Sequence, residues 1–468
     1  MTDVFYEFNG VPTTYLEFAL KVNARSRVFS RYTSSVIGLW AHNGPDFIIN
    51  VFAIWKAGAI PLLLSTRLPE AMIKALLEES RAALLVTAFP IENSSIPRIS
   101  SDCLDCADQH TGEGPSLPSI GCDDQETVLI AHSSGTTASP KLVRVKKEGL
   151  HIVLDYVLNH WNGMWTERDA TIGWLPLFHL YAFINELLVC YKRKGRYCFC
   201  KPSGREITAL IMREGSPVTL LFTVPWMLTT ILEMPLGLSA LKKLRYVMVS
   251  GAVLGHDLGM YLAAEGVRLV QLYGLTEVGT WFMSRVTDNS DWRDLYPVTP
   301  QTFWHLEEGS GQLVINSGYP MLSPGGPSLR TGDLFQQTPD GAYRYISRTD
   351  DIIVHSNGEK SNAHVIEQII LSCLSSVVHH VLVTGSGRLR PACILQIKKE
   401  LTAEVRTQIV MAFEHINQTL PGYSRIPKDF ILVLAPSASL SLPVTAKNTV
   451  RRRDAEALFQ QELTTTVL

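Results

Sequence analysis

Residues 36–64 read VIGLWAHNGPDFIINVFAIWKAGAIPLLL, and the fold prediction starts from this stretch. Residues 36–41 form a short apolar run, residues 45–57 have the length and composition of a helix, and residues 59–64 are apolar again. A strand, a helix and a second strand in this order predict a parallel β–α–β unit, because two parallel strands need a long crossover connection.

The same alternation continues along the chain. Further apolar runs of strand length occur at residues 127–131, 171–175, 218–222, 246–249 and 267–272, with helix-like segments between several of them. Strands that alternate with helices indicate an α/β fold in which parallel-rich sheets are covered by helices on both faces.

A different pattern begins near Arg348. A polar turn is followed by a helix, two strand-like runs, a second helix and a strand, at residues 356–360, 362–373, either side of 385–387, 403–418 and 430–434. This pattern predicts a small α+β unit. We therefore expect a large N-terminal domain at residues 1–347 and a small C-terminal domain at residues 348–468.

Composition excludes several classes of function. The 468 residues carry a formal net charge of −2, which gives no general attraction to nucleic acid or to anionic membranes. The N-terminus lacks the pattern of a secretory signal and no apolar stretch fits a membrane span, so a cytoplasmic protein is expected. The eight cysteines lack the paired spacing of a zinc site or a disulfide framework.

A loop rich in hydroxyl groups follows the apolar run at residues 127–131. Residues 131–141 read AHSSGTTASPK, and the groups that could donate to a polyphosphate belong to Ser133, Ser134, Gly135, Thr136, Thr137 and Lys141. Hydroxyls and backbone N–H groups donate to phosphate oxygens, glycine allows close approach and lysine supplies positive charge. The Walker pattern is absent, and taken alone the loop is also compatible with an ordinary turn.

This loop and four later segments resemble the adenylate-forming superfamily of acyl-CoA synthetases, peptide-synthetase adenylation domains and luciferases. The loop matches [ST]-S-G-[ST]-[ST]-G-x-P-K except at Ala138, where the family usually has glycine. The later segments, in the family's order, are WLPLFH, YGLTE, RTGDL and SRTDD at residues 174–179, 273–277, 330–334 and 347–351. Their spelling is most similar to fungal peptide-synthetase-like and reductase-type adenylation domains.

The resemblance implies that ATP and a carboxylic acid form an acyl-adenylate, which a thiol of coenzyme A or phosphopantetheine then captures. It assigns Glu277 to Mg²⁺, Thr276 to the α-phosphate and Tyr273 to adenine, with Gly251, Ala252 and Gly274 beside the nucleotide. Carboxylates ligate Mg²⁺ and aromatic faces stack on bases. Without the motif, Tyr273 would be interpreted as a core tyrosine and Glu277 as a solvated carboxylate.

The resemblance gives four more residues a role. Asp333 is implied to hold the ribose hydroxyls, Arg348 to contact ribose or phosphate, and Asp350 to be the hinge of the small domain. His179 is implied to gate or orient the substrate carboxylate. The alternatives are a turn carboxylate for each aspartate, a surface ion pair for Arg348 and a core histidine for His179.

The catalytic lysine is expected at Lys447. Residues 441–452 read SLPVTAKNTVRR and resemble the variant motif P-x-T-x-K-G-T-V-x-R, with Asn448 in place of glycine. The resemblance implies that Lys447 bridges the carboxylate and the α-phosphate. The alternative is a solvated lysine.

The sequence narrows the chemical class of the carboxylic acid and of the thiol acceptor. Residues 180–183, LYAF, contain no aspartate to pair with a substrate ammonium, so an aryl, 2-oxo or other non-α-amino acid is expected. Phe222, Pro225, Trp226 and Met227 are either pocket wall or core helix. No carrier-protein motif occurs, so we expect the thiol from coenzyme A or from a separate carrier protein or synthase. The fungal-type spelling of the motifs implies a role in secondary metabolism.

The alternative function is a weakly active or inactive adenylation-like protein that binds a ligand as a regulator or scaffold. Ala138 and the irregular spelling around Lys447 motivate this alternative.

Overall fold

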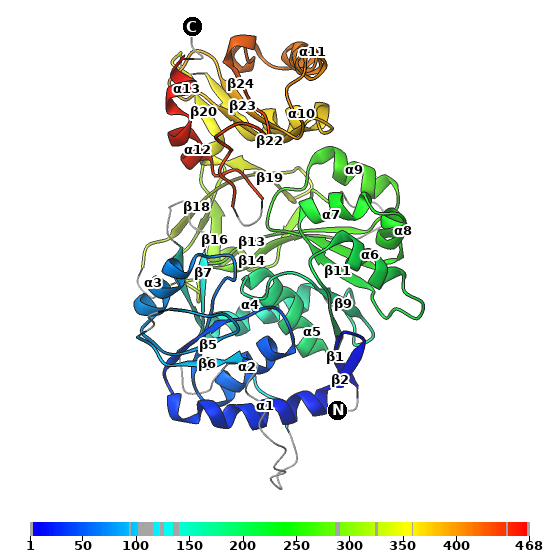
Figure 1. The fold of residues 1–468 in the computed structure, drawn as a ribbon, viewed down its shortest axis with the longest axis vertical. Coiled ribbons are helices and arrows are strands. Elements are labelled where there is room, and N and C mark those ends of the chain that lie inside the picture. The colour runs from blue at the N-terminus through cyan, green and yellow to red at the C-terminus, as the bar shows by residue number, and fades with distance from the viewer. Residues whose placement is uncertain are drawn as a thin grey trace. The chain divides into compact units, whose positions relative to one another are not determined.

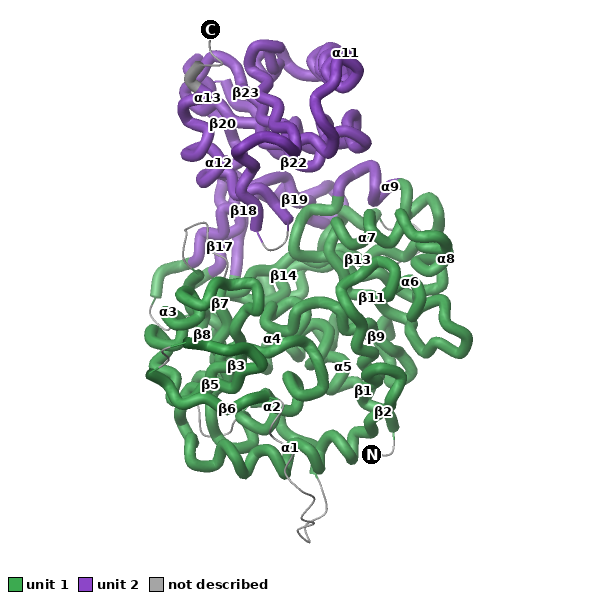
Figure 2. Tube along the Cα trace, viewed as in Figure 1, with its two compact units in different colours: residues 1–254, 261–303, 316–328 green, residues 255–260, 304–315, 329–468 purple. Residues whose placement is uncertain are grey.

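The computed structural model describes residues 3–92, 95–101, 116–121, 126–133, 140–161, 163–285, 291–322, 326–357, 359–445 and 448–465. It divides into two compact units, which Figure 2 shows in green and purple. Unit 1 comprises residues 1–254, 261–303 and 316–328, and unit 2 comprises residues 255–260, 304–315 and 329–468. No helix within the described ranges is long and apolar enough to cross a membrane.

One sheet of unit 1 has the strand order β6-β5-β3-β4-β7-β8. Its strands are β3 (Val36–Trp40), β4 (Ile60–Leu63), β5 (Ala82–Thr87), β6 (Arg98–Ser100), β7 (Thr127–Ser133) and β8 (Lys141–Lys146). All neighbours are parallel except β7 and β8, which are antiparallel. Helix α2 (Pro45–Lys56) connects β3 to β4, which confirms the predicted β–α–β unit.

Close packing explains why the opening stretch forms a buried strand. Every residue of β3 is buried, and a Cβ on Gly38 would lie 2.6 Å from a side-chain carbon of Leu77 in α3 (Glu70–Ser80). Only glycine lets this helix approach the strand so closely. Trp40, Leu62 and Ile130 extend the same apolar core across β3, β4 and β7.

The second sheet of unit 1 has the order β15-β14-β13-β12-β11-β9-β10-β1-β2. Its strands are β1 (Val4–Phe8), β2 (Val11–Thr14), β9 (Ala170–Gly173), β10 (Arg196–Phe199), β11 (Leu220–Thr223), β12 (Tyr246–Val249), β13 (Leu269–Leu275), β14 (Gly279–Ser284) and β15 (Leu295–Pro297). Neighbours from β13 to β1 are parallel. These parallel strands include the predicted apolar runs, so the α/β prediction is confirmed.

Helices cover both sheets of unit 1 (Figure 1). They are α1 (Tyr15–Phe29), η1 (Ser30–Tyr32), α4 (Lys147–His160), α5 (Val189–Arg193), α6 (Gly204–Met212), α7 (Pro225–Leu232), α8 (Gly237–Lys243), α9 (His256–Ala264), which contributes to both units, and η4 (Gln301–Phe303). Helix α4 contacts β7 and β8 of one sheet and β14 of the other, so it joins the two sheets.

The chain after His179 forms a helix of an unusual kind. Residues Tyr181–Leu188 form a π-helix, η3, and only then does the chain continue as α5. Such wide turns are rare and are often found at functional sites. Apolar periodicity predicts a helix here but does not distinguish its hydrogen-bond pattern.

Unit 2 contains the small α+β fold expected at the C-terminal end. Its elements are β16 (Trp304–Leu306), β17 (Gln312–Ile315), β18 (Leu329–Gln337), β19 (Tyr343–Arg348), η5 (Thr349–Asp351), β20 (Ile352–Val354), β21 (Lys360–Asn362), α10 (Ala363–Cys373), β22 (Val378–Thr384), β23 (Ala392–Ile397), α11 (Ala403–Thr419), η6 (Gly422–Ser424), η7 (Lys428–Phe430), β24 (Ile431–Leu434), α12 (Arg452–Leu458) and α13 (Gln460–Thr465). Ile366, Ile370, Leu395 and Phe413 are core residues that join α10 and α11 to the β22-β23-β24 sheet.

Candidate active site

The two ends of the predicted phosphate loop are held together by the β7–β8 pair. Ser133 at the end of β7 and Lys141 at the start of β8 are direct antiparallel partners. Lys141 is exposed. The predicted binding residues Ser134, Gly135, Thr136 and Thr137, with Ala138 and the side chain of Ser133, lie outside the described residues. The strand pair thus brings the two ends of the predicted loop together.

His132, directly before Ser133, has a role that the sequence analysis missed. Its Nε2 accepts a hydrogen bond of 3.1 Å from the backbone N–H of Ser65. Its ring lies 6.3 Å from that of Phe178 at an interplanar angle of 17°. Burial lowers the pKa of His132 to about 4. Because Nε2 is an acceptor, the neutral ring carries its proton on Nδ1.

The segment at residues 174–179 follows β9 and is fixed by Asn43, a second residue that the sequence analysis missed. The side-chain amide of Asn43 donates to the carbonyl of Leu175 at 2.6 Å and accepts from the N–H of Leu177 at 3.0 Å. The half-buried His179 ring lies 4.5 Å from that of Phe178. Phe178 therefore contacts both His132, which precedes the predicted phosphate loop, and His179.

The other predicted site residues of unit 1 follow or end parallel strands. They are Gly251 and Ala252 after β12, Tyr273 and Gly274 in β13, and Thr276 and Glu277 between β13 and β14. Gly251 has a φ of 81°, and a Cβ on Gly274 would lie 2.4 Å from the carbonyl oxygen of Gly279. Both positions need glycine. The side chains of Tyr273, Thr276 and Glu277 are half-buried.

Two hydrogen bonds connect the His179 segment to the same sheet edge. The indole N–H of Trp174 donates to the carbonyl of Phe222 in β11 at 2.8 Å, and the hydroxyl of Tyr181 donates to the carbonyl of Met248 in β12 at 3.0 Å. The carboxyl ends of neighbouring parallel strands meet at one edge, where α/β folds bind ligands. His179, Gly251 and Tyr273 therefore belong to one edge of one sheet.

A buried carboxyl group lies on the π-helix behind this edge. Glu186 is fully buried, and one of its oxygens accepts a hydrogen bond of 2.8 Å from the hydroxyl of Thr171. Its other oxygen has no hydrogen-bond partner in the described part of the chain. Burial raises the pKa of Glu186 well above its ordinary value, so we expect a protonated, neutral group. Its only signal in the sequence is a single Glu within an apolar run.

The four residues that the sequence assigned either to the pocket wall or to a core helix differ in their burial. Phe222 is fully buried and stacks on Trp161 with ring centroids 5.3 Å apart, and Met227 is also fully buried. Pro225 begins α7. Trp226 is 36% exposed and meets Trp174 edge to face at 6.0 Å. Phe222 and Met227 are therefore core residues, whereas the side chain of Trp226 is partly exposed.

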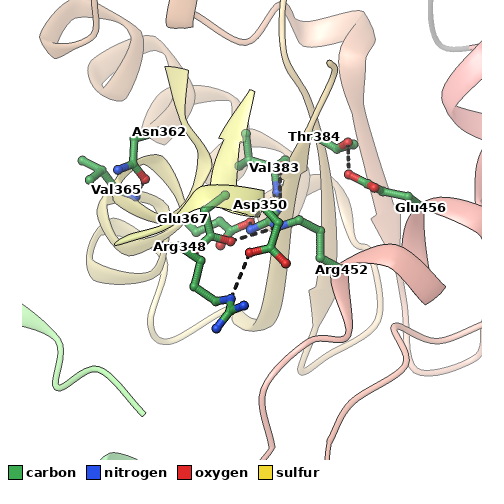
Figure 3. A network of polar contacts seen from close by, with 10 residues as sticks. Arg348, Asp350, Asn362, Val365, Glu367, Val383, Thr384, Arg452 and Glu456 are labelled. Atoms are coloured by element: carbon green, nitrogen blue, oxygen red, sulfur yellow. Dashed lines mark hydrogen bonds and ion pairs between the residues drawn. The ribbon is translucent and has the colours of Figure 1, made fainter. Parts of the chain in front are cut away.

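In unit 2, Arg348 contacts both Asp333, the residue predicted to bind ribose, and Asp350, the predicted hinge residue. Asp333 in β18 and Arg348 in β19 are cross-strand partners, with Nη1 of Arg348 3.3 Å from the Asp333 carboxylate. Nε of Arg348 donates to Asp350 at 2.9 Å (Figure 3). A Cβ on Gly332, whose φ is 76°, would lie 2.9 Å from the guanidinium, so glycine leaves room for it. Asp333 is buried and therefore needs this charged partner.

Lys447 and Ala446 lie outside the described residues, but the chain on either side of them is described. Val444 and Val450 form an antiparallel bridge, and the N–H of Thr445 donates to the carbonyl of Thr449 at 2.8 Å. We call the described residues on either side, 443–445 and 448–451, the lysine ribbon. Asn448 has a φ of 62°, a left-handed conformation that glycine and asparagine adopt most readily. This conformation explains why asparagine can stand where the family has glycine.

Comparison with known families shows which family the chain matches. A family model described as AMP-binding enzyme matches residues 2–307, and one described as AMP-binding enzyme C-terminal domain matches residues 350–466. The chain is 26% identical over 456 residues to a non-ribosomal peptide synthetase of Acremonium egyptiacum, covering 91% of this chain and 41% of that protein. It is 24% identical over 455 residues to an adenylate-forming reductase of Stachybotrys bisbyi, covering 90% and 42%. The chain thus spans about two fifths of the length of these relatives.

Solved structures share the fold. The O-succinylbenzoate coenzyme A synthetase of Bacillus subtilis in complex with AMP has a TM-score of 0.73 at 19% identity, covering 96% of this chain and 94% of that one. ATP-bound MatB of Rhodopseudomonas palustris has a TM-score of 0.79 at 16% identity, covering 99% and 97%. At these identities the likeness establishes the fold alone.

Proposed function

We propose that this chain, which belongs to the family of AMP-binding enzymes, activates a carboxylic acid as its acyl-adenylate at the expense of ATP. One oxygen of the acid forms a bond to the α-phosphorus, and the bond from that phosphorus to the leaving pyrophosphate breaks. The observation that carries the proposal is the contact of His132 with Phe178, which joins the phosphate-loop strand to the His179 segment. ATP phosphates and a carboxylate would meet at this contact.

The described residues suit the two binding tasks. Tyr273 is a half-buried aromatic side chain at the sheet edge and would take the adenine, while Asp333 offers two acceptor oxygens to the ribose hydroxyls. Glu277 carries the oxygen ligands that Mg²⁺ prefers, and Thr276 would donate to the α-phosphate. Mg²⁺, when bound, would neutralise charge on the phosphates. His179 would orient the acid and Lys447 would bridge it to the α-phosphate.

The acid is proposed to lack an α-amino group. An ammonium group in a closed pocket needs a carboxylate partner. Residues 180–183 contain none, and the nearby carboxyl of Glu186 is enclosed in the core with Thr171 and is expected to be neutral. Trp226 supplies an exposed aromatic face beside Trp174. These features favour an aryl, 2-oxo or other uncharged acid.

The second half-reaction transfers the acyl group to a thiol. The thiol sulfur forms a bond to the acyl carbon, the bond from that carbon to AMP breaks, and the thiol proton is released. Coenzyme A or a carrier-protein phosphopantetheine is the acceptor. Relatives named as a peptide synthetase and as a reductase, both fungal, are compatible with a carrier protein and with a role in secondary metabolism.

Pyrophosphate release tests the first half-reaction. The full chain is mixed with ATP, Mg²⁺ and a panel of aryl, 2-oxo, aliphatic and α-amino acids. We expect release with at least one acid that lacks the α-amino group. No release with any acid, together with saturable nucleotide binding, would favour the alternative of a ligand-binding regulator or scaffold.

A further inference from the structure

Arg452 lies directly after the lysine ribbon, and its guanidinium contacts three groups of unit 2 (Figure 3). Nε lies 3.0 Å from the carboxylate of Asp351, Nη2 lies 2.8 Å from that of Glu367, and Nη1 donates to the carbonyl of Val383 at 2.6 Å. Only 15% of the Arg452 side chain is exposed. The three partners come from η5, α10 and β22, so Arg452 connects three elements of unit 2.

Asp351 connects Arg452 to the predicted hinge. One oxygen of Asp351 accepts from Nε of Arg452, and the other accepts from the backbone N–H of Arg348 at 3.2 Å. The preceding residue, Asp350, accepts from the side chain of Arg348. Two neighbouring carboxylates of one short turn thus bind two arginines, one in β19 and one at the base of the lysine ribbon.

The base of the ribbon is closed beside Arg452. The N–H of Arg451 donates to the carbonyl of Pro443 at 2.8 Å, below the Val444–Val450 bridge. Glu367 is itself held, because its bonded oxygen also accepts the N–H of Val383 at 2.8 Å. The planar guanidinium makes directional contacts that an ammonium could not reproduce together. Arg452 therefore anchors the C-terminal end of the ribbon to η5, α10 and β22.

We propose that Asp351 and Arg452 are positioning residues that anchor the lysine ribbon to the turn at Thr349–Asp351, and that adenylation requires this anchor at the ends of the segment that carries Lys447. The proposal rests on the proposed function, since it takes Lys447 as the lysine of that reaction. It adds a physical connection between hinge and lysine that neither motif implies.

The kinetic test compares Arg452→Lys and Asp351→Asn with a matched control, Arg451→Gln. Arg451 is the adjacent arginine, its side chain is 44% exposed and its ion pair is with Asp454 at 2.7 Å. Because small misplacements of a catalytic group are costly, we expect kcat for pyrophosphate release to fall about tenfold or more in the first two variants, with the KM for ATP within about twofold. The control keeps wild-type kcat.

Combining Arg452→Lys with Lys447→Ala distinguishes an effect of Arg452 through Lys447 from a general loss of active-site structure. If Arg452 acts through Lys447, adding Arg452→Lys to Lys447→Ala lowers the remaining rate no further. A further tenfold fall in the double variant, or equal losses in Arg451→Gln, would overturn the proposal.

Amide hydrogen exchange of the full chain gives a readout that does not depend on activity. We expect the N–H groups of Thr445, Asn448 and Thr449 to exchange faster in Arg452→Lys and Asp351→Asn than in wild type or Arg451→Gln. Unchanged exchange would overturn the anchoring role. Absence of pyrophosphate release in wild type would refute the proposed function instead, and the exchange data would still decide whether the ribbon is anchored.

Discussion

The imidazole of His132 lies nearly parallel to the ring of Phe178, with their centroids 6.3 Å apart, while its Nε2 accepts the N–H of Ser65. His132 lies near the end of β7 and Phe178 follows β9, a strand of the other sheet of unit 1. One neutral histidine thus joins the start of the predicted phosphate loop, the residue Ser65 that follows β4 and the segment that carries His179.

His132→Phe separates the ring contact from the hydrogen bond. The new ring keeps the contact with Phe178 but leaves the buried N–H of Ser65 without its acceptor, which we expect to cost about 1–3 kcal/mol of unfolding free energy. Denaturant unfolding of both proteins measures the difference. An unchanged unfolding free energy would show that the Ser65 bond contributes nothing.

The lowered pKa of His132 predicts that the difference in stability between wild type and His132→Phe depends on pH. The native pKa of His132 is about 4 and the ordinary value is 6.5, so the unfolded state binds the proton first as the pH falls. His132 therefore favours the native state fully above about pH 6.5, and this contribution is lost between pH 6.5 and 4. The stability of wild type relative to His132→Phe should fall over that interval. A constant difference would contradict the lowered pKa.

Glu186→Gln tests the neutral state of the buried carboxyl. Because the native pKa is raised, the native state takes up a proton that the unfolded state has lost above its ordinary pKa of 4.5. Wild-type stability should therefore decline by up to about 1.4 kcal/mol per pH unit as the pH rises above 4.5, relative to Glu186→Gln. Unfolding at pH 5, 6 and 7 measures this slope. A constant difference, or a slope of the opposite sign, would mean an ionised Glu186.

Asp333→Asn tests the proposed ribose contact. The amide keeps the shape of the side chain but removes the charge that faces Arg348 and one acceptor oxygen. We expect kcat/KM for ATP to fall by roughly 10–100-fold, the value of a charged hydrogen bond. Asp340→Asn, on an exposed turn of the same unit, is the control and should match wild type. Equal activity of both variants would remove Asp333 from the site.

Local sequence patterns were sufficient for the parallel architecture. Apolar runs separated by a helix-length segment require a crossover, and β3, α2 and β4 lie within one or two residues of their predicted bounds. The π-helix at Tyr181–Leu188 was not predictable in this way, because apolar periodicity does not distinguish the hydrogen-bond pattern of a helix. Asn185 accepts from Thr280 of β14, almost a hundred residues away.

The sequence by itself determined the fold class, the order of the elements and the family, since these depend on periodicity and on residues that are neighbours in the chain. Only the tertiary structure decided which residues meet: His132 with Phe178, Asn43 with the segment before His179, and Arg452 with Asp351. Each of these contacts joins parts of the chain tens of residues or more apart. Such contacts depend on packing and on the need of buried polar groups for partners, which no local pattern records.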